Sequence, residues 1–179
     1  MSAPAPVIRP SREADAEAIT AIYAHHVMHG LASFEEAPPD VFEIARRRVE
    51  VLARGWPHLV AEAPGGAVLG YAYCGPYRPR PAYRFTVEDS VYVAPASIGR
   101  GVGARLLPAL IEAAAQAGAR QMVAVIGDSA NGPSIGLHAR FGFRQVGVLD
   151  AVGFKLGRWV DGVIMQRALG EGSTTPPSR

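Results

Sequence analysis

The stretch SVYVAPASIGRGVGARLL, residues 90–107, decides the fold, because it leads from a strand into an apolar helix through three closely spaced glycines. The turn Gly99–Gly103 exposes backbone N–H groups beside the positive end of the helix dipole, an arrangement that suits a pyrophosphate. The turn lacks the Lys-Ser/Thr ending of a P-loop and the third glycine of the dinucleotide-binding motif, which weakens an ATP or NAD interpretation. The alternative is that the glycines serve only close packing of the strand against the helix.

Strand and helix patterns continue on both sides of this stretch. Residues 85–93 alternate between an apolar and a polar face. Asp40 is the expected N-cap of a helix that ends at Arg54, and Pro108 predicts that the helix after the glycine turn bends or starts late. Strands are expected at 7–10, 59–61, 68–74, 85–93, 122–126, 143–149 and 159–166, and helices at 15–28, 40–54, from the glycine turn to about 117, and at 134–141. This order predicts an α/β or α+β fold with one mixed sheet and helices on both faces.

Composition sets the class of protein. Of the 179 residues, 49% are hydrophobic and 19% charged, which predicts one folded domain over residues 1–169, followed by a flexible tail at 170–179. The net charge of +2 argues against nucleic-acid binding. No apolar stretch is long enough to span a membrane and the first residues do not form a signal peptide, so we expect a cytoplasmic protein. The single Cys74 excludes an internal disulfide, and neither it nor the histidines have metal-site spacing, so no metal is expected.

Val91–Pro95, the turn Gly99–Gly103 and the pair Leu106-Leu107 resemble the acetyl-CoA motif of the GNAT superfamily of N-acetyltransferases. Ile8–Pro10 and Asn131–Phe143 are similar to its opening strand and its later asparagine-helix-aromatic segment, so the resemblance covers residues 7–168. Segments that look most like the phosphinothricin and methionine sulfoximine acetyltransferase branch are 34–35, 86–93, 123–127, 137–138, 153–155 and residue 159. The resemblance implies a GNAT-like mixed sheet, acetyl-CoA as cosubstrate and a homodimer.

The resemblance also implies which residues bind acetyl-CoA. The main chain of Val91–Val93 would receive the pantetheine arm as an added strand does. Asn131 and Ser134 would hold the arm, and the same residues also suit the cap of a local helix. Ile98 stands where the family pattern has Gln or Arg, so that polar contact is either lost or supplied by Arg100. The full predicted set is Val91, Tyr92, Val93, Gly99, Arg100, Gly101, Val102, Gly103, Ala104, Asn131 and Ser134.

Acetyl transfer to an amine needs a base, because a free amine is mostly protonated at neutral pH. Glu88 is the candidate, since partial burial on the strand before the glycine turn would raise its pKa. Its alternative role is a salt bridge with an arginine. His138 stands where the family usually has a tyrosine, and it either protonates the leaving thiolate or is a hydrogen-bonded core histidine. Cys74 has no histidine near it in the sequence, which disfavours a covalent thiol intermediate.

Three segments are expected to bind the amine substrate: residues 34–35, 78–83 and 153–159. Arg78 and Arg80 alternate in a proline-rich loop and suit capture of a carboxylate, phosphinate or sulfoximine group, or else they form only a solvated basic loop. The resemblance places Lys155 near a second acidic group of the substrate. The full predicted set is Phe34, Glu35, Arg78, Arg80, Tyr83 and Lys155.

These observations together predict an acetyl-CoA-dependent N-acetyltransferase. We expect it to act by direct transfer on the α-amino group of a small amino acid, or of an analogue such as phosphinothricin or methionine sulfoximine. Two alternatives remain at this point: a protein or peptide N-acetyltransferase, and a non-catalytic acyl-CoA-binding sensor. The basic pair Arg78 and Arg80 argues against the first, because a lysine or an N-terminus would be better received by acidic residues.

Overall fold

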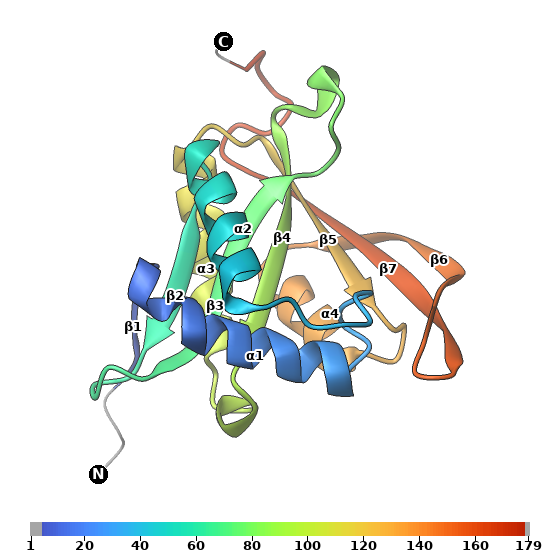
Figure 1. Ribbon diagram of the computed structural model, residues 1–179. Helices are drawn as coiled ribbons and strands as arrows, with labels where there is room; N and C mark the ends of the chain where they lie inside the picture. Colours follow the sequence, from blue (N-terminus) through green and yellow to red (C-terminus); the bar gives the residue numbers. More distant parts are fainter. Residues whose placement is uncertain (1–4, 178–179) are drawn as a thin grey trace.

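The computed structural model describes residues 5–177 and contains a seven-stranded mixed sheet covered by four α-helices (Figure 1). The strands are β1 Val7–Pro10, β2 His58–Glu62, β3 Val68–Pro76, β4 Thr86–Val93, β5 Gln121–Gly127, β6 Arg144–Lys155 and β7 Arg158–Ala168. The helices are α1 Ala16–His29, α2 Val41–Ala53, α3 Gly103–Gln116 and α4 Gly132–Arg140, with 3-10 turns at 13–15, 81–83 and 95–97. The predicted mixed α/β sheet is confirmed.

The sheet has the order β1-β2-β3-β4-β5-β7-β6, and every neighbouring pair is antiparallel except β4 and β5. Helices α1 and α2 pack on one face, where Ile19, Ile44 and Val60 are buried together. Helix α3 packs on the opposite face, where Leu106 and Leu107 join a second buried cluster. The alternation predicted for residues 85–93 therefore serves two hydrophobic layers, one on each side of the sheet.

The parallel pairing of β4 with β5 is short, and this feature creates the site. It joins Thr86 to Gln121, Val87 to Met122 and Glu88 to Val123. Beyond these pairs the two strands diverge, while β4 continues its antiparallel pairing with β3 as far as Val93. The backbone of residues 89–93 therefore keeps one edge that no strand of the described chain covers.

Two local expectations are corrected by the structure. Helix α3 begins at Gly103 and continues through Pro108, so the late start is wrong. The proline removes one backbone hydrogen bond at a cost of about 3 kcal/mol, whereas each fully buried leucine of this helix contributes about 2 kcal/mol. The segment 153–159, expected to bind substrate and, up to residue 158, left outside the expected strands, is instead the end of a long β6–β7 hairpin. Register shifts at 145–147 and 149–153 interrupt the two-residue period there, which hides the strand from a sequence reading.

Residues 170–175 form turns and bends that contact Arg120, the residue directly before β5. The Arg120 guanidinium donates hydrogen bonds to the backbone carbonyls of Gly172, at 2.9 Å, and Thr175, at 2.7 Å. The mobility of the tail stays a prediction, and positions 178 and 179 of that tail lie outside the described residues. Across residues 5–177, no helix is long and apolar enough to cross a membrane.

Candidate active site

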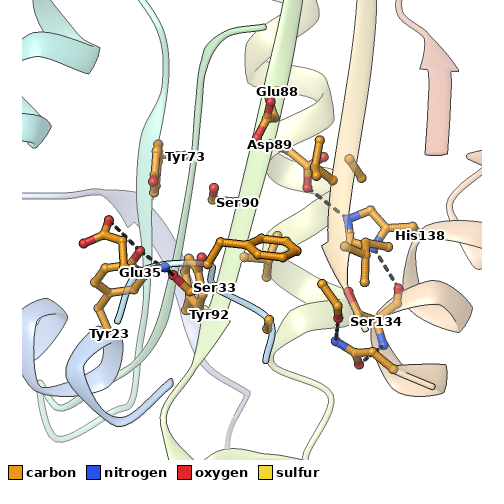
Figure 2. Close-up of a pocket in the computed structure, with 18 residues that line it drawn as sticks. Tyr23, Ser33, Glu35, Tyr73, Glu88, Asp89, Ser90, Tyr92, Ser134 and His138 are labelled. Atoms are coloured by element: carbon orange, nitrogen blue, oxygen red, sulfur yellow. Dashed lines mark hydrogen bonds and ion pairs between the residues drawn. The ribbon is translucent and has the colours of Figure 1, made fainter. Parts of the chain in front are cut away.

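A cavity of about 430 Å³ lies where β4 and β5 diverge. Figure 2 shows its side chains coming from both strands, from α1 and α4, and from the segment between α1 and α2. Its lining residues are Tyr23, Ala32, Ser33, Phe34, Glu35, Tyr73, Glu88, Asp89, Ser90, Val91, Tyr92, Ala124, Val125, Ile126, Gly127, Asn131, Ser134 and His138. The cavity thus brings together predicted catalytic, cofactor-binding and substrate-binding residues that are far apart in the sequence.

The glycine turn presents free backbone donors at the start of α3. Within residues 5–177, no acceptor pairs with the N–H groups of Gly99, Gly101, Val102, Gly103 and Ala104. Gly99 and Gly101 have φ angles of 78° and 76°, which favour glycine, and a Cβ on either would meet no atom within 4 Å. A Cβ on Gly103 would lie 3.2 Å from the Leu137 side chain. Close packing therefore explains the glycine at position 103. Gly99 and Gly101 are required instead by the positive φ angles of the turn.

Glu88 is the free carboxylate of the cavity. Among the described residues it forms no hydrogen bond and no ion pair, so the alternative of a salt bridge with an arginine is not what the structure contains. Burial raises the pKa of Glu88, and the neighbouring negative charge of Asp89 adds to the rise, while Arg78 partly opposes it. A carboxylate with a raised pKa and free lone pairs is suited to accept a proton from an amine.

His138 is buried in the wall of the same cavity and is fully hydrogen-bonded. Its Nε2 lies 3.0 Å from Asp89 Oδ2, and its Nδ1 lies 2.7 Å from the carbonyl oxygen of Ser134 (Figure 2). Burial alone would lower the pKa of His138, but the hydrogen bond to Asp89, its charge and the Ser134 carbonyl together raise it. The sequence analysis missed Asp89, because it lies on the apolar face of β4 and 49 positions away from its partner.

Asn131 and Ser134 line the cavity and also cap α4. The side chain of Asn131 accepts a hydrogen bond from the Ser134 backbone N–H at 3.2 Å. The capping role is therefore present, and both residues also line the cavity. Another contact that the sequence did not indicate joins His26 Nε2 to the Val93 carbonyl oxygen at 2.8 Å, which fixes α1 against the end of β4.

The segment 31–35 forms the opposite wall. Glu35 accepts a hydrogen bond from the Tyr23 hydroxyl at 2.9 Å and pairs with the Arg47 guanidinium at 2.5 Å. The ring of Phe34 covers Gly153 so closely that a Cβ at that glycine would lie 2.2 Å from the ring. These contacts hold the segment in place, and they leave its backbone at the edge of the cavity.

Four predicted substrate-binding residues are not in the cavity wall. Lys155 is 3% exposed and donates a hydrogen bond from Nζ to the Ser33 carbonyl at 2.6 Å, so it supports the 31–35 segment from behind. Burial lowers the pKa of Lys155. Arg78, Arg80 and Tyr83 lie on the exposed loop before β4, where the Arg78 guanidinium stacks over the Tyr77 ring at 5.0 Å. Their roles in substrate binding stay predictions.

The acetyltransferase (GNAT) family profile matches residues 20–143. The chain is 58% identical to phosphinothricin N-acetyltransferase of Alcaligenes faecalis, over 95% of this chain and 86% of that protein. It is 44% identical to L-methionine sulfoximine/L-methionine sulfone acetyltransferase of Pseudomonas aeruginosa, over 94% and 98%.

Solved structures with the same fold belong to the same kind of enzyme as these relatives. A phosphinothricin acetyltransferase from Sinorhizobium meliloti, crystallised with acetyl-CoA, superposes with a TM-score of 0.95 and 44% identity, over 98% of this chain and 95% of that one. A putative acetyltransferase from Salmonella typhimurium, crystallised with acetyl-CoA, superposes with a TM-score of 0.92 and 40% identity, over 98% and 99%. Fold, glycine turn and sequence agree, and the chain belongs to the GNAT acetyltransferase family.

Proposed function

We propose that this enzyme transfers the acetyl group of acetyl-CoA directly to the α-amino group of a small amino acid or analogue, such as phosphinothricin or methionine sulfoximine. The observation that carries the proposal is Glu88, a half-buried carboxylate of the cavity wall that has no hydrogen-bond or ion-pair partner within residues 5–177. The glycine turn, whose N–H groups lack acceptors in the same range, packs through Gly103 against Leu137 of α4, the helix that also lines the cavity. The names of the relatives, which acetylate phosphinothricin and methionine sulfoximine, support the substrate class.

In this proposal the cosubstrate lies along the open edge of β4. The free N–H groups of residues 99–104 bind its diphosphate at the positive end of α3. Ile98 stands where the family pattern has a polar side chain, and Arg100 supplies a positive charge in its place. Val91–Val93 bind the pantetheine arm through main-chain groups, with Tyr92, Asn131 and Ser134 along its path. One of these N–H groups stabilises the negative charge that develops on the carbonyl oxygen.

Glu88 then acts as the base. The amine must lose a proton before its nitrogen can attack, and the raised pKa of Glu88 suits it to accept that proton directly or through water. Cys74 does not serve as a nucleophile, because burial, followed by the nearby charge of Asp89, raises the pKa of its thiol to about 12. Direct transfer, without an acetylated enzyme, follows from this pair of observations.

The amine lies against Phe34 and Glu35 in the proposed complex. Glu35 is held by Tyr23 and Arg47, so it provides a fixed wall rather than a mobile arm. Arg78 is outside the cavity, yet its charge acts on the pKa of Glu88. We therefore propose that the 77–85 loop, with Arg78, Arg80 and Tyr83, approaches the acidic group of the bound substrate, while Lys155 acts indirectly by holding Ser33.

We also propose a homodimer in a reducing compartment such as the cytoplasm. The edge strand β6 and its hairpin expose a row of apolar side chains, namely Val146, Val148, Leu149, Val152, Phe154, Leu156 and Trp159. An exposed edge of this kind is usually covered by a partner. Light scattering measures the oligomeric state, and Val146→Glu should shift it toward the monomer. The single, buried Cys74 is compatible with the reducing compartment.

The experiment is a screen for thiol release from acetyl-CoA with amino acids, sulfoximines, phosphinates, polyamines and peptides. Glu88→Gln should lower kcat by about 100-fold or more and leave the Kd of acetyl-CoA unchanged, because the amide keeps the shape but accepts no proton. The exposed Glu17→Gln is the matched control. Turnover of Glu88→Gln at the wild-type rate contradicts the assignment. Turnover restricted to peptides favours the peptide acetyltransferase, and acetyl-CoA binding without turnover favours the sensor.

A further inference from the structure

Asp89 and His138 form a closed pair in the cavity wall. Their side chains are 1% and 6% exposed, and their contact joins β4 to α4. The Ser134 carbonyl can only accept a hydrogen bond, so His138 Nδ1 carries a proton. Nε2 faces Asp89 Oδ2 at 3.0 Å, and this contact requires one more proton between the two atoms. The pair therefore holds one proton in addition to the one on Nδ1.

That shared proton is hard to remove. With the proton on the nitrogen the pair is an imidazolium and a carboxylate, and with the proton on the oxygen it is an imidazole and a carboxylic acid. Both forms are neutral overall. Loss of the proton would leave a buried negative charge, which is costly. Asp89 Oδ1 increases that cost, because it is buried and has no hydrogen-bond partner among the described residues.

Within residues 5–177, Asp89 is the one charged group that pairs with His138, and the Ser134 carbonyl is its other hydrogen-bond partner. Glu88 precedes Asp89 on β4, and Cys74 is its antiparallel partner on β3, with a thiol that burial keeps neutral. The Phe143 ring packs perpendicular to the imidazole, with 5.1 Å between the ring centroids. No arginine or lysine within residues 5–177 forms a salt bridge with Asp89. The state of His138 thus depends on one carboxylate.

A second buried histidine shows what happens without that carboxylate. His58 is 4% exposed, its ring stacks on Tyr71 and Tyr73, and its Nδ1 has no partner in the described chain. Burial, together with the positive charge of Arg48, lowers the pKa of His58 to about 4. The charge of Asp15 opposes this lowering only in part, and within residues 5–177 no carboxylate forms an ion pair with His58. His58 is therefore an internal control for a buried imidazole without a directly bonded carboxylate.

We propose that Asp89 is a positioning residue that acts through His138: it fixes the imidazole in the cavity wall and keeps on the pair one proton that is delivered to the departing thiolate of coenzyme A. The inference rests on the proposed function. In the transfer the C–N bond forms, the C–S bond breaks, and the electron pair of the C–S bond goes to sulfur. Glu88 takes one proton from the ammonium before attack, sulfur takes the shared proton as the C–S bond breaks, and the second proton of the new amide nitrogen passes to water. Exchange with water then restores both Glu88 and the Asp89–His138 pair.

The first measurement is an NMR titration of the ring nitrogens and their protons in the isotope-labelled wild-type protein. The proposal expects His138 to keep its shared proton to a pH above the ordinary histidine pKa of about 6.5, because the hydrogen bond and the charge of Asp89 raise the pKa of His138. His58 should be neutral throughout the same range. In Asp89→Asn, His138 should instead become neutral near or below pH 6.5, as His58 does. A wild-type His138 that titrates like an ordinary histidine overturns the proposal, even if Asp89→Asn does not fold.

The second measurement is the pH dependence of kcat. Asp89→Asn should lower kcat at about pH 8 by about 10-fold, less than the about 100-fold typical of a general acid, because a thiolate with a pKa of about 8.5 leaves readily. In the pH profile of kcat for Asp89→Asn, the decrease on the alkaline side should begin at a lower pH than in the wild type. The KM for acetyl-CoA should stay unchanged. The exposed Glu17→Gln on α1, which makes the same carboxylate-to-amide change outside the cavity wall, is the control. An unshifted profile in a folded Asp89→Asn overturns the role in turnover. Failure of the proposed function would appear separately, as wild-type enzyme that acetylates no amine.

Discussion

Gly127 is the residue at which the geometry of the cavity is most sensitive to a small change. It ends β5 and lies in the cavity wall, where the backbone of the 31–35 segment crosses it. A Cβ at this position would lie 2.1 Å from the Leu31 carbonyl oxygen and 3.3 Å from Ala32 Cα. Both are backbone atoms, so no side-chain rotation relieves the contact. Gly127→Ala must therefore displace the segment that carries Ser33, Phe34 and Glu35.

The size of the effect follows from that distance. Ordinary contact begins at 3.4 Å, so the carbonyl must move by 3.4 − 2.1 = 1.3 Å. Forcing one extra carbon into a packed site typically costs 1–3 kcal/mol, and we expect about 2 kcal/mol of lost stability for Gly127→Ala. A misplacement of about 1 Å at a substrate wall can reduce the rate by about 100-fold. The kcat/KM for the amine should fall by about 10- to 100-fold, with a smaller change in KM for acetyl-CoA.

Urea unfolding and steady-state kinetics measure the two effects. Gly136→Ala is the control, because Gly136 is exposed on α4 and its Cβ would meet no atom within 4 Å. This control should gain about 0.5–1 kcal/mol, since alanine is the better helix former. The reasoning is refuted if Gly127→Ala unfolds at the wild-type urea concentration and keeps the wild-type kcat/KM for the amine.

Three further predictions concern stability and mechanism. Asp40→Ala removes the side-chain oxygen that accepts a hydrogen bond from the Glu43 N–H at 2.8 Å. The free energy of unfolding, measured in urea, should fall by about 1 kcal/mol, and an unchanged midpoint of unfolding would argue against the cap. Cys74→Ala should retain turnover, and an acetylated thiol detected by mass spectrometry in the wild type would overturn direct transfer. His58 has a folded-state pKa of about 4 against about 6.5 when unfolded, so the unfolded chain binds its proton first and stability rises with pH between these values. The rise should be about 3 kcal/mol and should be absent in His58→Gln; equal pH slopes for the two proteins would contradict it.

The sequence was most informative where structure depends on nearby residues. The glycine turn, the Asp40 cap and the alternation of residues 86–92 all depend on dihedral preferences or side-chain spacing over a few positions. The family resemblance and the mixed sheet are confirmed for the same reason, since they rest on these local motifs. The β6–β7 hairpin was misjudged because its register shifts break the local period.

The sequence alone determined the glycine turn, the order of the elements and the polar face that carries Glu88. Only the tertiary structure decided that β4 and β5 diverge after Glu88, that Asp89 is paired with His138 while Glu88 is left free, and that Lys155 lies behind Ser33. The reason is physical: backbone preference acts within a few residues. Burial and hydrogen-bond partners are set by segments that meet only after packing, such as Lys155 and Ser33, 122 positions apart.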